Sequence, residues 1–296
     1  RLDLEEEYAK KEADTKLSRF EEVQAKRLEE YKERVADADN ANELIRNAEL
    51  DHQKSIEDAK IKHGNAIAAI EDGFITKRIL AKDKEYCLDF YLTCILNQTY
   101  DKKKIHLYIR TNDNKDDTQY TLSEFVKKHG EKYASVYYNT DSISNDLKKY
   151  SEHEWNSARF NILGKIRQES IDYAIEKNTH YFVADCDNFI TADTLENLYN
   201  LKNLGVVGPM LRQSPEQGYS NYHNIACPLG YFKENKEYYH ILDQRVKGLI
   251  EVDTIHCTYF IHNDTLKDIN YNDGSKRHEY VVFSDVLRKK NIKQYL

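Results

Sequence analysis

A short apolar segment that ends in two carboxylates constrains the fold of this chain more than any other feature. Residues 181–184 (Tyr-Phe-Val-Ala) lead directly into Asp185, Cys186, Asp187 and Asn188. The apolar run predicts a buried parallel strand, and the turn chemistry of Asn188 predicts where that strand ends. Because side chains alternate along an extended chain, Asp185 and Asp187 are expected to point the same way.

The position of this acid pair at a strand end indicates a metal site. Ligands of open α/β sheets bind at the carboxyl ends of strands, and neighbouring acids repel unless a cation lies between them. Because oxygen ligands suit Mg²⁺ and Mn²⁺, Asp185 and Asp187 are candidate ligands for a cation that holds a diphosphate. The alternative is an acidic turn that caps a helix or is solvated. The segment Asp37-Ala38-Asp39 has the same Asp-x-Asp pattern, but it lies within a long helical run, where residues two apart do not face one another.

Composition excludes several classes of protein. The 296 residues allow one large domain or two small ones. A net charge of −7 argues against a nucleic-acid binder, and no apolar run approaches the length of a membrane span. The five cysteines are scattered without a CxxC pair, so neither a zinc site nor a disulfide framework is predicted. No signal peptide is visible, and because the chain begins at Arg1 rather than Met we expect a fragment.

Residues 1–63 form a segment of their own character, and residues 64–296 are predicted to form the second domain. The first segment contains no glycine before Gly64 and no proline, and its acidic and basic residues alternate at helical spacing. Its apolar seam is thin, which is a weak version of a coiled-coil pattern. A single helix of that length would be roughly 90 Å long. We expect a helical stalk that forms a homo-oligomer; the alternative is a solvated helix or helical hairpin with no role in catalysis.

Beyond residue 64 the pattern alternates between strand and helix. Such alternation predicts an α/β fold whose mostly parallel sheet carries helices on both faces. The C-terminal third has shorter strands and more turns, and we expect it to build the acceptor-binding half. The predicted strands cover residues 74–80, 105–110, 133–138 and 181–184, and the predicted helices cover residues 84–96, 120–129 and 157–177.

Six segments, taken in order, carry a resemblance to a known family. They are residues 109–118 (with Asn114, Asp116 and Thr118), Trp155-x-x-x-Arg159 with residues 165–168, residues 185–188, residues 206–211, residues 219–221 and residues 255–261. This set resembles the collagen (procollagen) galactosyltransferases, which are nucleotide-sugar-dependent enzymes of GT-A fold. The resemblance covers about residues 80–291, the amino-terminal catalytic half of the family proteins. Here the paired acids near the end of that half appear as His278-Glu279, so only the second acid is kept. The second domain of the family proteins has no counterpart in this sequence. The charged helix at the front of this chain has no counterpart in the family.

The resemblance implies a metal-dependent inverting transfer of galactose from UDP-galactose to hydroxylysine in a collagen-like protein. It implies that Asp187 binds Mn²⁺ or Mg²⁺ directly, that Asp185 holds the ribose or the water shell of the metal, and that His256 is the third ligand. A core histidine is the structural alternative for His256. An inverting displacement needs a general base, for which Glu279 is the candidate with Asp285 behind it. The alternative is that Glu279 caps a helix.

The resemblance also implies a set of residues that bind the UDP-sugar. The ends of the first two strands are where such folds seat uracil and ribose, and the helix before the acid pair offers cations for the diphosphate. A tryptophan could stack on a base or sugar. Polar loops, a solvated helix face and a structural tryptophan are the alternatives. The residues are Ala81, Lys82, Asp83, Thr111, Asp113, Trp155, Lys165 and Arg167.

Other functions stay open at this point. A UDP-glucose or UDP-N-acetylhexosamine transferase would use the same acids, and a coiled-coil scaffold could carry an inactive transferase domain. A nucleotidyl- or phosphotransferase would normally need a glycine-rich phosphate loop, which is missing. For the compartment, the resemblance implies the lumen of the endoplasmic reticulum, whereas a viral origin would place the chain in the cytoplasm of a host cell.

Overall fold

The computed structural model describes residues 2–36, 41–71, 73–143, 156–213 and 218–296. The chain divides into two compact units, Arg1–Asp72 and Gly73–Leu296. Asp37, Asp39 and Trp155 lie outside the described residues. Within the described ranges no helix is both long enough and apolar enough to cross a membrane.

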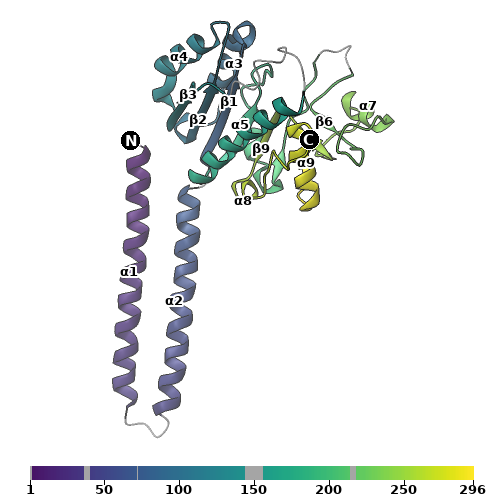
Figure 1. Ribbon diagram of the computed structural model, residues 1–296. Coiled ribbons are helices and arrows are strands. Elements are labelled where there is room, and N and C mark those ends of the chain that lie inside the picture. The colour runs from purple at the N-terminus through teal and green to yellow at the C-terminus, as the bar shows by residue number, and fades with distance from the viewer. Residues whose placement is uncertain (1, 37–40, 72, 144–155, 214–217) are drawn as a thin grey trace. The chain divides into compact units, whose positions relative to one another are not determined.

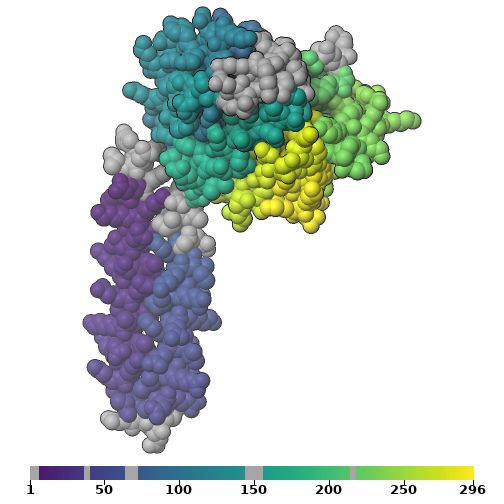
Figure 2. Space-filling view, in the orientation of Figure 1, coloured from purple at the N-terminus to yellow at the C-terminus, as the bar shows by residue number. Residues whose placement is uncertain are grey.

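The first unit is a hairpin of two helices, α1 (Leu2–Val35) and α2 (Ala41–Glu71), which lie against each other in Figures 1 and 2. Ion pairs that join the two helices show that they are antiparallel, because residues late in α1 meet residues early in α2. The N···O distances are 2.7 Å for Lys32–Glu49, 3.6 Å for Glu21–Lys60 and 3.0 Å for Asp14–His63. The helical segment is therefore a hairpin rather than one helix of roughly 90 Å.

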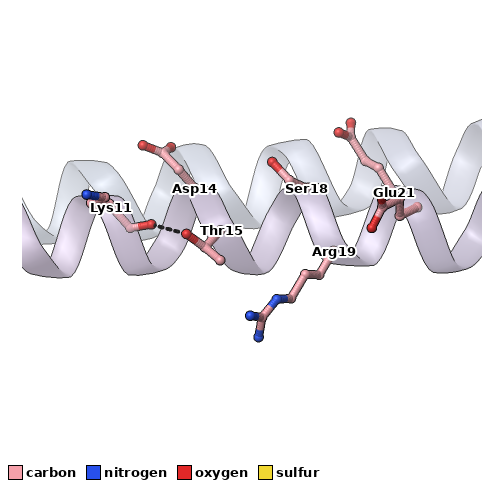
Figure 3. Close-up of a pocket in the computed structure, with 7 residues that line it drawn as sticks. Lys11, Asp14, Thr15, Ser18, Arg19 and Glu21 are labelled. Carbon is pink, nitrogen blue, oxygen red and sulfur yellow. Dashed lines mark hydrogen bonds between the residues drawn. The ribbon is translucent and has the colours of Figure 1, made fainter.

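The hairpin shows no buried core among the side chains that the structure describes. Among its described side chains none is fully buried, and apolar residues such as Val23, Leu50 and Ile61 remain exposed. A hollow of about 540 Å³ on this unit is lined by seven residues of α1 alone (Figure 3). In it the Thr15 hydroxyl donates to the carbonyl oxygen of Lys11 one turn earlier. Because one helix supplies the whole lining, this hollow has no opposite wall to enclose a ligand.

The second unit is built on a sheet with the strand order β3-β2-β1-β4-β9-β5-β10-β7. The strands β3, β2, β1 and β4 are parallel neighbours, β9 runs antiparallel to both β4 and β5, and β10 pairs parallel with β5 and antiparallel with β7. A small second sheet pairs β6 with β8. The bounds are β1 Ile75–Ala81, β2 Ile105–Thr111, β3 Ser135–Asn139, β4 His180–Ala184, β5 Val206–Val207, β6 Tyr222–His223, β7 Glu251–Val252, β8 Thr254–Ile255, β9 Thr258–Ile261 and β10 Gln294–Tyr295.

Helices cover both faces of this sheet (Figure 1). One apolar cluster joins the sheet to α3, α4 and α6, and the other joins it to α5, α7, α8 and α9. Alternate residues of β4 divide between the clusters: Phe182 and Ala184 enter the first, and Tyr181 and Val183 enter the second. The helix bounds are α3 Glu85–Leu96, α4 Thr118–His129, α5 Ser157–Glu176, α6 Thr194–Tyr199, α7 Lys236–Leu242, α8 Asn263–Leu266 and α9 Glu279–Lys289; short 3₁₀ turns span Lys102–Lys104, Gly130–Lys132 and Lys202–Leu204.

The predicted α/β class is confirmed, with a mostly parallel sheet and helices on both faces. The strands and helices predicted from residue 74 to residue 184 are present, with ends that differ by one or two residues. The predicted domain boundary at residue 63 falls inside α2, which continues to Glu71. In Figures 1 and 2 the segment that carries α7 lies at the opposite side of the second unit from α4.

Candidate active site

Asp185 follows β4 directly and is held by two arginines. The Arg78 side chain donates from Nη2 to Asp185 Oδ1 at 2.6 Å, and Arg167 Nη2 lies 3.5 Å from Asp185 Oδ2. Arg78 comes from the neighbouring strand β1, where it pairs in register with Val183, and Arg167 comes from α5. Burial alone would raise the pKa of Asp185, but the positive charges of Arg167 and Arg78 outweigh it and lower that pKa. Asp185 is therefore an ionised carboxylate with both oxygens engaged.

Asp187 has a different environment from Asp185. Lys84 at the start of α3 donates from Nζ to Asp187 Oδ2 at 2.8 Å, and the side chain of Asp187 is 47% exposed. The expectation that both acids point the same way fails here because the extended strand ends at Ala184. The Asn188 amide donates to the Asp185 carbonyl at 2.8 Å, which closes a turn and sends the two carboxylates to different partners.

A second buried basic residue lies beneath the end of β4. Lys77 on β1 is fully buried, and its Nζ donates to the Ala184 carbonyl at 3.3 Å and to the Tyr91 hydroxyl at 3.0 Å. Burial lowers the pKa of Lys77 to about 7. Sequence reasoning missed both Lys77 and Arg78, although two adjacent basic residues in a strand covered on both faces are a usable signal. Buried charges of this kind need partners, and the acids of the next strand are the obvious ones.

His256 lies beside the acid turn, because the amide of Asp185 donates to the carbonyl of Cys257 at 2.9 Å. The imidazole is 4% exposed; its Nδ1 is 2.8 Å from Cys257 Sγ and its Nε2 is 3.4 Å from the Tyr219 hydroxyl. Burial, followed by the neighbouring His223, lowers the pKa of His256 to about 3, so the ring is neutral. Cys257 has a φ of 66° and links β8 to β9 in a left-handed conformation that non-glycine residues seldom adopt.

Aromatic and histidine rings surround His256. The ring of Tyr280 lies 4.9 Å from that of His256, and the ring of His223 lies 5.6 Å away, measured between centroids. His223 is buried, its pKa is lowered to about 4 by burial and by Arg288, and its Nδ1 has no hydrogen-bond partner in the described part of the chain. Sequence reasoning missed His223, which the pairing of β6 with β8 brings to this place.

Glu279 begins α9 and is 2% exposed. Its Oε1 lies 3.3 Å from Arg167 Nε, and its Oε2 lies 2.7 Å from His278 Nδ1. Burial opposes ionisation of Glu279, but Arg167 and His278 lower its pKa overall. Arg167 therefore joins Asp185 to Glu279 in one charged network. The N-terminal position of Glu279 also suits the helix dipole of α9.

Asp285 is engaged elsewhere. Its carboxylate lies 3.0 Å from Arg277, 3.4 Å from Arg288 and 2.9 Å from Lys289. Lys289 and Arg277 lower the pKa of Asp285 against the effect of burial. The structure thus places Asp285 in a structural ion cluster, while Glu279 lies in the network of Asp185.

The loops after β1 and β2 are joined by hydrogen bonds. The Asp83 amide donates to Asn114 Oδ1 at 3.0 Å, and the Lys115 amide donates to Asp83 Oδ1 at 2.7 Å. Asn114 in turn donates to the buried Thr111 hydroxyl at 2.6 Å. Asp113 accepts from Ser142 at 2.7 Å. The side chains of Asp83 and Thr111 are therefore used to shape these loops.

The remaining predicted donor-binding residues are dispersed. Ala81 is buried at the end of β1, whereas Lys82 and Lys165 are exposed. Arg167 reaches Asp185, but Lys165, two positions earlier on α5, lies on another face of the helix. Trp155 is outside the described residues.

The chemistry of these residues fits a divalent cation whose shell the substrate completes. Asp187 is a half-exposed carboxylate and His256 is a neutral imidazole, which are ligand types that Mn²⁺ accepts. No group of three or more His, Cys, Asp or Glu side chains in the described ranges is arranged to hold a metal. Mg²⁺-type sites commonly use one or two carboxylates and take their other ligands from water and substrate phosphates.

The sheet order, with acids at the carboxyl end of its central strand, defines an α/β protein whose candidate active site lies at that edge. The sequence profile described as "Glycosyltransferase family 25, N-terminal domain" matches residues 74–286. The chain belongs to glycosyltransferase family 25, as the resemblance predicted.

Relatives within this family carry names of two kinds. The chain is 28% identical to the inactive glycosyltransferase 25 family member 3 of Mus musculus over 192 residues, which cover 63% of this chain and 32% of that protein. It is also 28% identical to procollagen galactosyltransferase 2 of Mus musculus over 188 residues, which cover 62% and 29%. The matched region thus spans about a third of these relatives. The sequence identity is 28% in both cases, so identity alone does not assign this chain to the inactive members or to the procollagen galactosyltransferases.

A solved structure with a similar backbone is S. aureus TarS, with 14% identity and a TM-score of 0.47. The alignment covers 72% of this chain and 33% of that chain. A likeness of this degree says nothing about the ligand of this protein.

Proposed function

We propose that residues 73–296 form the catalytic domain of a metal-dependent, inverting galactosyltransferase. The donor would be UDP-galactose and the acceptor would be a hydroxylysine side chain of a collagen-like protein. One observation supports the proposal: the turn after β4 carries an accessible carboxylate (Asp187), the neutral imidazole of His256 lies beside that turn, and the ionised buried Glu279 shares Arg167 with Asp185. The procollagen galactosyltransferase names of relatives supply the sugar and the acceptor class.

In this proposal Asp187 and His256 hold the divalent cation, Mn²⁺ or Mg²⁺, together with the UDP diphosphate. The cation would supply Lewis-acid stabilisation of the departing diphosphate. Lys84, which is paired with Asp187 in the structure, would then be released to contact a phosphate oxygen. Asp185 keeps its arginine partners and orients the turn that carries Asp187.

The transfer itself is a single displacement at the anomeric carbon. The acceptor oxygen forms a bond to C1 as the bond from C1 to the diphosphate oxygen breaks, and the electron pair leaves with UDP. The acceptor proton must pass to a base, for which the ionised, buried Glu279 is the candidate. Arg167 holds that carboxylate in place through its Nε.

Turnover with a panel of UDP-sugars tests this function. We expect galactose transfer from UDP-galactose to a hydroxylysine-bearing peptide in Mn²⁺, detected by mass spectrometry. Asp187→Asn should lower the rate by at least 100-fold, whereas Asp264→Asn, at an 86% exposed side chain, should leave it unchanged. Transfer of glucose or an N-acetylhexosamine instead would correct the donor. No transfer from any donor would favour an inactive domain on a helical scaffold.

A further inference from the structure

Residues 225–233 form a loop that folds back on itself and presents apolar side chains to solvent. An antiparallel bridge pairs Ala226 with Phe232. The amide of Lys233 also donates to the carbonyl of Ile225 at 3.1 Å. The large apolar side chains of the loop that remain exposed are those of Ile225, Leu229, Tyr231 and Phe232. A single exposed apolar residue is ordinary on a protein surface, whereas a cluster within one short loop marks an interaction site.

Hydrogen bonds from outside the 225–233 loop hold its backbone. The amide of Ala226 donates to Asp253 Oδ2 at 2.7 Å. Nearer the middle of the loop, Arg277 Nη1 donates to the carbonyl of Leu229 at 3.2 Å. Because the backbone is fixed at both points, a ligand would meet the apolar side chains on an ordered support, which lowers the entropic cost of binding.

The loop is joined to the candidate active site at two points. The Tyr231 hydroxyl accepts from the amide of His278, the residue before α9, at 3.4 Å. The ring of Phe232 lies 5.3 Å from the ring of His223, which lies 5.6 Å from the ring of His256, measured between centroids. In Figure 1 the segment that carries β6 and α7 lies beside α9. The loop is therefore next to the side of the site that His256 and α9 form.

The exposed side chains of this region combine aromatic rings with hydroxyl groups. Tyr219 is 54% exposed and has its hydroxyl 3.4 Å from His256 Nε2, and Tyr231 supplies a second ring and hydroxyl on the loop. A polyproline II segment has no internal hydrogen bonds, so its carbonyls are open to such donors, and its stiffness leaves little entropy to lose. Proline-rich segments of this kind dock on surfaces lined by aromatic rings. The chemistry of the region therefore fits an extended, proline-rich polypeptide.

We propose that the 225–233 loop and Tyr219 bind the acceptor polypeptide as an extended polyproline II segment next to the residue that receives the sugar. The proposal rests on the proposed function and adds the surface that selects the acceptor. A collagen-like chain suits this surface, because Gly-x-y sequence rich in proline favours that conformation. An acceptor chain continues past its reactive side chain, and the loop is an ordered apolar surface near His256 on which it can lie. Such contacts stabilise the bound acceptor and the transition state alike, so they set KM rather than kcat.

Binding of a short fluorescent hydroxylysine peptide to the full chain, with UDP and Mn²⁺ present, tests the surface by anisotropy. One peptide has proline at each x position of Gly-x-y, and its control has alanine there. We expect the proline peptide to bind the wild type about 10-fold more tightly than the alanine peptide. The double variant Ile225→Ser, Leu229→Ser should weaken binding of the proline peptide by about 10-fold. In steady-state kinetics with UDP-galactose, KM for this peptide should rise by the same factor, while kcat changes by less than about twofold.

Leu201→Ser, at an exposed leucine after α6, is the matched control and should leave both peptide binding and KM unchanged. An active wild type that binds the two peptides equally, or whose double variant keeps its KM, would overturn the role of the loop alone. Peptide binding that depends on the loop, without transfer from any UDP-sugar, would overturn the proposed function and support the surface. Neither binding nor transfer would overturn both. A lower mass of the double variant in light scattering would assign the loop to contact with a second copy of the chain and overturn its role in acceptor binding.

Discussion

At the scale of single residues, the two acids after β4 differ in their ion-pair partners and in their exposure. Asp185 neutralises Arg78, which is 1% exposed, and shares Arg167 with Glu279. Asp187 meets only Lys84 among these cations and stays half-exposed. Removal of one partner from a buried ion pair leaves an uncompensated charge, whereas an exposed pair contributes little to stability.

The substitution Asp185→Asn should therefore lower the free energy of unfolding by about 3 kcal/mol or more. Asp187→Asn should change it by less than about 1 kcal/mol. Urea unfolding followed by circular dichroism measures both. Equal effects of the two substitutions would show that Arg78 and Arg167 do not depend on Asp185.

Lys77 makes the free energy of unfolding depend on pH, and the sign of that dependence follows from its pKa. Its pKa is lowered from 10.5 to about 7 in the folded state. Between these values the unfolded chain binds one proton more than the folded chain, so stability rises with pH across that window. Below about pH 7 both states carry the charge, and the cost of burying it is present in full.

We expect the stability of the wild type relative to Lys77→Met to increase by about 2 kcal/mol from pH 7 to pH 9. Denaturant unfolding of both proteins at each pH gives this difference, and groups common to both cancel. A difference that is constant or falls with pH would contradict burial of an uncharged Lys77.

At the scale of elements, α5 is positioned by a close backbone contact that also places Arg167. A Cβ added at Gly164 would lie 2.8 Å from the carbonyl oxygen of Tyr271. In an open helix Ala is favoured over Gly by about 1 kcal/mol. Here the contact reverses that preference, because backbone cannot move away as a side chain can.

Gly164→Ala should therefore destabilise the second unit by about 1–3 kcal/mol. Gly130→Ala is the matched control, since its φ is −54° and its Cβ would meet only side chains at ordinary distances of 3.5 Å or more. In thermal unfolding, the changes in melting temperature relative to the wild type should differ between the two variants in sign or clearly in size. A stabilising Gly164→Ala would show that α5 can shift away from Tyr271.

The elements that sequence could predict are those whose pattern is local. The apolar run of β4 and the periodicity of α5 lie within single segments, and both elements form where expected. The two-residue strands β5, β6, β8 and β10 have too little pattern of their own, because their pairing is set by distant partners.

The residues of the candidate site also fall into those that the sequence could predict and those that it could not. Asp185, Asp187 and Glu279 mark the ends of predicted elements, so sequence could indicate them. The cations that balance them could not be chosen from a pattern, because Arg78 reaches Asp185 only through the pairing of β1 with β4. The divergence of the two acids also depends on the turn that Asn188 closes with the carbonyl of Asp185, which the alternation of a strand does not describe.

At the scale of the whole molecule, the two units differ in how they are stabilised. Ion pairs join the two helices of the hairpin, which has no fully buried side chain among those described. The second unit has two apolar clusters. Exposed ion pairs and a thin seam contribute little compared with a buried core.

We therefore expect the hairpin to melt at a lower temperature than the second unit. Circular dichroism at 222 nm should show two transitions in the full chain and only the later one in a chain of residues 73–296. Light scattering on both chains tests the proposed oligomer of the helical segment. One cooperative transition in the full chain would mean that the hairpin draws its stability from a partner helix or from the second unit.

The central claim is that Asp187, at the carboxyl edge of the sheet, binds a divalent cation together with a UDP diphosphate. Calorimetric titration of the full chain with UDP, in the presence and absence of Mn²⁺, tests it most directly. The account predicts binding that requires Mn²⁺ and is lost in Asp187→Ala, with the fold intact by circular dichroism. Equal UDP binding without the metal, or unchanged metal-dependent binding in Asp187→Ala, would contradict it.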